Sequence, residues 1–133
     1  MPISRRLPIA LLPLLLLLMA FRQAPLVDPA PIAVPANISQ VNVGKAIEMA
    51  LIHRGWTASN QATGAMDGTL HLREHVATIH ITWDARGVEI KYVSSANLKY
   101  EEEKGQRLIH KNYLSWIENL VIDIKSNMVL LEG

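Results

Sequence analysis

The sequence predicts an α+β domain in which two helices cover one face of a small antiparallel sheet. Residues 39–56 and residues 107–128 carry apolar side chains at the spacing of amphipathic helices. Residues 69–93 instead alternate between apolar and polar side chains, which is the pattern of strands with one buried face. The expected order is therefore helix, short strand, three-stranded antiparallel meander and C-terminal helix, with both helices packed on the apolar face of the sheet.

The first helix has an apolar stripe and a signal at each end. Ser39 or Asn42 can cap its start with a side-chain oxygen, and Gly55 favours a left-handed turn that ends it. A short strand is expected from Trp56 to about Asn60. The stripe consists of Val43, Ala46, Ile47, Ala50 and Leu51.

The meander and the second helix supply the rest of the predicted core. We expect a two-residue turn at Glu74 and His75, and a tight turn from Asp84 to Gly87, where Gly87 tolerates a positive φ. The acidic residues 101–103 are interpreted as a solvated loop, and the second helix is expected to begin near Arg107. The inward side chains are Leu70, Leu72, Ala77, Ile79, Ile81, Trp83, Val88, Ile90 and Tyr92 in the sheet, followed by Ile109, Tyr113, Trp116, Ile117, Leu120, Ile124 and Met128 in the helix.

Residues 1–22 have the layout of an export signal. Arg5 and Arg6 precede the nearly all-apolar stretch LPIALLPLLLLLMAF. These fifteen residues, broken by two prolines, fall short of the roughly 20 that span a bilayer comfortably. A periplasmic or secreted protein is therefore expected. The alternative is an uncleaved signal that anchors the domain in the inner membrane.

Proline and glycine usage divides the remainder of the chain. All seven prolines lie between Pro2 and Pro35, and all seven glycines lie between Gly44 and Gly133. Residues 23–38 are therefore predicted to be an extended, proline-rich linker, and residues 39–133 to be the small α+β domain.

Charge and cysteine content narrow the class of protein. The formal net charge of +1 becomes slightly negative once Arg5, Arg6 and Arg22 are set aside, and no basic run follows. This argues against nucleic acid as a partner and limits the expected membrane contact to an uncleaved N-terminal segment. The chain has no cysteine, so neither disulfides nor a lipid anchor can support it.

Histidines on the outer face of the meander raise the question of a metal site. With the turn at Glu74 and His75, His71 and His80 become diagonal neighbours, and Glu89 could join them in a facial ligand set. No histidine pair has the spacing of a helical metal motif, however, and a solvated polar face is the favoured interpretation. No metal ligand and no cofactor are assigned.

Ser95 and His110 are the minimum for nucleophilic catalysis. No carboxylate is obviously placed to orient His110, and no glycine-rich elbow surrounds the serine. The favoured interpretation is that Ser95 and Asn97 close the connection after the sheet while His110 bonds a loop carbonyl. No catalytic residue is assigned. The candidates for partner binding are His71, Arg73, His75, His80, Ser95, Asn97, His110 and Asn112.

Four stretches, AIEMALIHRGW, LREHVATIHI, IKYVSSANLKY and LIHKNYLSWIENL, together resemble a group of small uncharacterised bacterial envelope proteins over about residues 43–124. The resemblance implies an envelope location and a helix–meander–helix domain, and it implies no reaction. Members commonly carry a lipid-anchored cysteine, which this chain lacks, and Leu114 stands where a polar residue, often asparagine, is expected.

The leading hypothesis is an exported, non-enzymatic module that binds another envelope component in the periplasm. The alternatives are a small hydrolase-like enzyme that uses Ser95 and His110, and a histidine-based metal-binding module.

Overall fold

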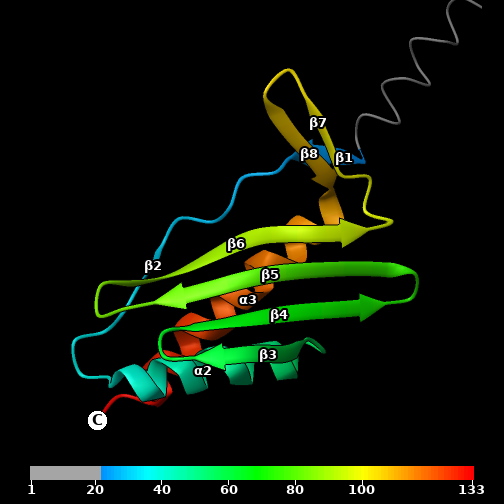
Figure 1. Cartoon of the computed structure of the whole chain (residues 1–133). Helices are drawn as coiled ribbons and strands as arrows, with labels where there is room; N and C mark the ends of the chain where they lie inside the picture. Colours follow the sequence, from blue (N-terminus) through cyan, green and yellow to red (C-terminus); the bar gives the residue numbers. More distant parts are fainter. Residues whose placement is uncertain (1–21) are drawn as a thin grey trace, which may run out of the picture.

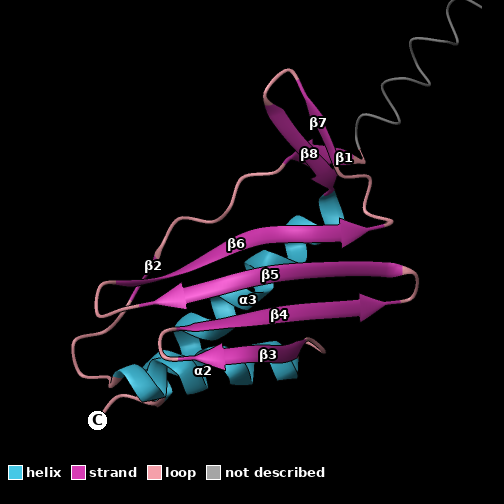
Figure 2. Ribbon diagram, viewed as in Figure 1, coloured by secondary structure: helices cyan, strands magenta, loops and turns pink. Residues whose placement is uncertain are grey.

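The computed structural model describes residues 22–133 and shows an α+β fold with two helices and two antiparallel sheets (Figure 2). Helices α2 (Gln40–His53) and α3 (Lys111–Leu130) lie behind the larger sheet (Figure 1), on one of its faces. The predicted export signal, residues 1–22, lies outside the described residues except for Arg22. Within the described range, neither helix has the length and hydropathy needed to cross a membrane.

The larger sheet has five strands, so the prediction of a three-stranded meander is wrong in its extent. The meander itself is present as β4 (Ala65–Leu72), β5 (His75–Trp83) and β6 (Gly87–Ala96). The expected short strand, β3 (Thr57–Ala62), pairs with β4 at one edge. The strand β2 (Ile32–Ala33) pairs with β6 at the other, giving the order β2-β6-β5-β4-β3.

Residues 22–38, here called the strap, belong to the fold and are not a free linker. The strap is extended, as its prolines predict, and its first strand β1 (Gln23–Pro25) pairs with β8 of the smaller sheet. Leu26 and Ile32 are only 4% and 2% exposed. Proline is tolerated here because the strap occupies sheet edges, where not every backbone N–H is needed in a ladder.

The smaller sheet is formed by a hairpin that the sequence did not predict. Strands β7 (Glu101–Glu103) and β8 (Gln106–His110) pair around Lys104 and Gly105, with φ angles of 53° and 76°. Two positive φ angles in succession suit the right-handed twist of a tight hairpin. The acidic run is therefore a strand, and α3 begins at Lys111 instead of near Arg107.

The turn between β4 and β5 lies one residue earlier than expected. Leu72 pairs with His75, so the turn residues are Arg73 and Glu74, and Arg73 has a φ of 57°. The alternation of side chains across the sheet is unaffected, but Leu72, which was expected to face the core, is 44% exposed because it lies at the end of β4 beside the turn. The cross-strand partners do change, because the register shifts along the strands.

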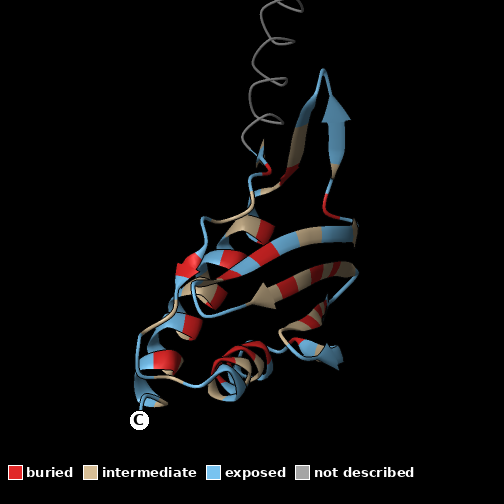
Figure 3. Cartoon of the chain, turned by 60° about the vertical axis from the view of Figure 1, so that its left-hand side comes forward, coloured by how far each residue is buried: buried red, intermediate tan, exposed pale blue. Residues whose placement is uncertain are grey.

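The core lies between the five-stranded sheet and the two helices, where the buried sides of both face one another (Figure 3). The predicted stripes of both helices are confirmed, with Ile109 placed in β8 instead of α3 and Trp116 only partly buried. Ser39 caps α2, accepting from the Asn42 N–H at 3.1 Å, and Gly55 has a φ of 84°.

Two glycines in the sheet allow neighbouring segments, α2 and the strap, to pack closely against it. A Cβ on Gly68 would stand 2.9 Å from a methyl group of Leu51, so its absence allows α2 to approach β4. A Cβ on Gly87 would stand 3.1 Å from the carbonyl oxygen of Ile32. Gly87 does not have the expected positive φ. Its role is to accept the strap beside β6.

Candidate functional site

The outer face of the five-stranded sheet carries a histidine–aspartate hydrogen bond that the sequence did not predict. His80 Nδ1 lies 2.6 Å from Asp67 Oδ1, and Asn60 Nδ2 donates to the other carboxylate oxygen at 2.8 Å. These two hydrogen bonds, from Asn60 and then from His80, lower the pKa of Asp67 below its ordinary value. The aspartate is thereby held as an anion that orients the ring of His80.

The proposed metal ligands are not brought together. His71 pairs with Val76, four residues along β5 from His80, which corresponds to about 13 Å at the usual strand rise. The predicted diagonal contact between His71 and His80 is therefore wrong, because it depended on the turn at Glu74 and His75. Among residues 22–133 no group of three or more histidine, aspartate or glutamate side chains is arranged to hold a metal ion.

His75 and Asn97 form a clamp between two loops. His75 Nδ1 lies 2.7 Å from the carbonyl oxygen of Asn97, and Asn97 Nδ2 donates to the carbonyl oxygen of Glu74 at 2.7 Å. Asn97 has a φ of 58°, a conformation that asparagine tolerates better than most residues. The clamp fixes the β4–β5 turn against the end of β6, while Arg73 in that turn is exposed.

Ser95 and His110 have separate structural partners. Ser95 Oγ lies 2.7 Å from the hydroxyl of Tyr92, and His110 Nδ1 accepts from the backbone N–H of Asn112 at 3.1 Å. Within the described chain no hydrogen bond joins Ser95 to His110. His110 is the N-cap of α3, so the expected bond to a loop carbonyl is replaced by a bond to a helix N–H. The nucleophile–base pair that a hydrolase needs is not formed.

The environment of His110 disfavours the charged form of its ring. Partial burial, and then the positive charges of Lys99, His75 and Arg22, lower the pKa of His110 from its ordinary value of 6.5. Only the neutral ring has a lone pair on Nδ1 with which to cap the Asn112 N–H. The lowered pKa of His110 therefore favours the protonation state that the helix cap requires.

Acidification is expected to destabilise the fold through His110. The unfolded chain takes up a proton at pH values where folded His110 does not, so this contribution is fully present above about pH 6.5 and is lost as the pH falls below it. The variant His110→Ser keeps a good N-cap without a titrating ring. Urea midpoints at about pH 8 and about pH 5 should differ less in His110→Ser than in the parent. Equal differences would exclude His110 as the source.

Three tyrosines join the two sheets. The rings of Tyr92 and Tyr100 are stacked at 4.8 Å, and Tyr113 meets Tyr92 edge-on at 5.6 Å. Asp28 of the strap accepts the Tyr92 backbone N–H at 3.0 Å.

A hollow of about 680 Å³ lies between α2, the β3–β4 turn and the β5–β6 turn. Trp83 forms part of its wall, and its indole N–H donates to the carbonyl oxygen of Gln40 at 3.2 Å. A Cβ on Gly44 would stand 3.0 Å from the Trp83 ring, so this glycine lets the ring pack against α2. Val41 and Met66 add apolar surface.

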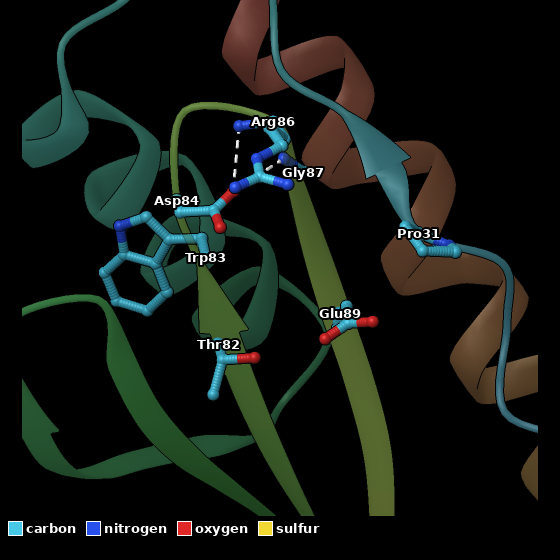
Figure 4. Close-up of a pocket in the computed structure, with 7 residues that line it drawn as sticks. All are labelled: Pro31, Thr82, Trp83, Asp84, Arg86, Gly87 and Glu89. Carbon is cyan, nitrogen blue, oxygen red and sulfur yellow. Dashed lines mark hydrogen bonds between the residues drawn. The ribbon is translucent and has the colours of Figure 1, made fainter.

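A second hollow, of about 310 Å³, shares Trp83 and Asp84 with the first. Thr82 and Glu89 come to it from adjacent strands, and Pro31 comes from the strap (Figure 4). Asp84 Oδ1 accepts the backbone N–H groups of Arg86 and Gly87, which lower the pKa of Asp84 below its ordinary value. Trp83 was expected to lie in the core, and the sequence pattern predicted neither hollow.

No family model matches the chain, and no curated protein or solved structure is significantly similar to it.

Proposed function

We propose that this chain is an exported, non-enzymatic module that binds another component of the bacterial envelope. The observation that carries the proposal is the large hollow beside Trp83. Its volume of about 680 Å³ lies within the roughly 300–1,000 Å³ typical of ligand sites. The export-type leader and the resemblance to envelope proteins support the location, and they leave open an uncleaved signal that anchors the domain in the inner membrane.

The chemistry of the hollow favours binding over catalysis. Its lining combines the Trp83 ring and the apolar side chains of Val41 and Met66 with charged groups. One of these groups, Glu48, accepts a hydrogen bond from the Gln61 side-chain amide. Asp84 is held by backbone N–H groups. Apolar walls with a few oriented polar groups select a ligand by shape and hydrogen bonding.

Photo-crosslinking in cells would test this assignment. A photoreactive residue placed at Val41, which is 69% exposed in the wall of the hollow, is expected to form a discrete adduct with an envelope component. The same residue at Lys125, exposed on α3, is the matched control. Equal labelling at both positions would contradict the proposal.

A further inference from the structure

A smaller hollow of about 270 Å³ lies beneath the strap. Val27 and Asp28 of the strap form one side, and Leu114, Glu118 and Val121 of α3 form part of the other. Leu114, which stands where the resemblance to envelope proteins leads us to expect a polar residue, lines this hollow. The volume falls just below the lower limit of about 300 Å³ typical of small-molecule sites, so the hollow suits a single long side chain.

The hydroxyl of Tyr113 is a polar group available to an occupant. Tyr113 is only 2% exposed, and its hydroxyl has no hydrogen-bond partner among residues 22–133. In the same range no fully enclosed side-chain oxygen or nitrogen lacks a partner, so the Tyr113 oxygen retains an opening. Tyr113 is one of the residues that line the hollow, so we infer that its hydroxyl is accessible from there. Burial and the neighbouring Asp28 raise the pKa of Tyr113, so the hydroxyl stays protonated at neutral pH.

The charged groups in the wall of the hollow are carboxylates. Asp28 already accepts the Tyr92 N–H and lies 3.7 Å from the guanidinium of Arg107. Glu118, one α3 turn from Leu114, is exposed and has no hydrogen-bond or ion-pair partner within the described part of the chain. A cationic head group with an aliphatic stem complements both the uncompensated carboxylate and the apolar walls.

We propose that the hollow beneath the strap is a docking pocket for a lysine or arginine side chain of a partner protein. The stem lies on Val27, Leu114 and Val121, and the charged head meets Glu118 while donating to the Tyr113 hydroxyl. This inference deepens the proposed binding function, since it names a chemical feature of the partner. It concerns a different hollow from the one beside Trp83.

Titration of the full chain with hexylammonium, followed by the NMR shifts of the Val27, Leu114 and Val121 methyl groups, tests the pocket. Hexylammonium is expected to move all three sets of resonances in a saturable way, whereas the neutral probe 1-hexanol is expected to bind about fivefold more weakly. Glu118→Gln should remove this preference. Glu101→Gln, which neutralises an exposed carboxylate in β7, should leave it unchanged.

Three results would overturn the pocket. They are the absence of saturable shifts, equal affinity for hexylammonium and 1-hexanol, and an unchanged preference in Glu118→Gln. Tyr113→Phe provides a second variant that keeps the ring packing, and it should weaken hexylammonium binding while leaving the fold intact. None of these outcomes bears on crosslinking from Val41, so the pocket and the broader binding function can fail separately.

Discussion

A chain that begins at Ala36 is expected to be largely unfolded in buffer. It lacks Leu26 and Ile32, whose side chains are 4% and 2% exposed in the fold. Burying each such side chain stabilises the fold by about 1.5–3 kcal/mol, and β2 also completes the edge of β6. Since domains of this size have about 5–15 kcal/mol of stability in total, the loss consumes much of it. Circular dichroism and urea denaturation provide the measurement.

The matched control is a chain that begins at Arg22 and keeps the whole strap. It should unfold cooperatively, and the single variants Leu26→Ala and Ile32→Ala should each lose about 2–5 kcal/mol of unfolding free energy. A cooperative transition of undiminished midpoint in the Ala36 chain would show that the strap is a dispensable linker after all.

Gly68→Ala is expected to reduce the free energy of unfolding by about 1–3 kcal/mol. The added Cβ would lie 2.9 Å from Leu51 Cδ2 and 3.3 Å from Ile79 Cγ1. Gly68 in β4, Leu51 in α2 and Ile79 in β5 are all buried, so the neighbours have little room to move. Urea denaturation of the parent and the variant gives the change directly.

A double variant separates steric overlap from any intrinsic cost of alanine in the strand. Leu51→Val shortens the side chain that the new methyl group would strike, so it should be less destabilising in the Gly68→Ala background than in the parent. A coupling free energy near zero in this cycle would show that Gly68 is not required for the approach of α2.

The regular parts of the fold follow from local patterns. Apolar spacing correctly predicted α2, the core face of α3 and the three strands of the meander, because each element buries one continuous face. Ser39 and Gly55 marked the ends of α2 for reasons that act within a few residues. These are the features that local chemistry determines.

The irregular parts depend on contacts distant in sequence. The strap has too many prolines for a regular pattern, and its two short strands exist only because β6 and β8 offer edges. Three consecutive glutamates have low strand propensity, so β7 was missed although Lys104 and Gly105 form a favourable turn. The register between β4 and β5 was not predicted correctly because it depends on a turn at Arg73, and arginine seldom adopts a positive φ.

The candidate sites were harder to predict for the same reason. The partnership of Asp67 with His80 depends on a register that a one-residue change in the turn abolishes. His110 was recognised as a residue at the edge of the core, yet its role as a cap follows from where α3 begins. The hollow beside Trp83 is bounded by three separate elements, and no single stretch of sequence contains them.

If residues 1–22 are the export signal that the sequence predicts, the strap restricts where that signal could be cleaved. Gln23 and Ala24 of β1 pair with His110 and Ile109 of β8. The carbonyl oxygen of Arg22 accepts the Lys111 N–H at 3.0 Å. A peptidase that cut after Ala24 would delete most of a strand, whereas a cut after Ala20 would spare it.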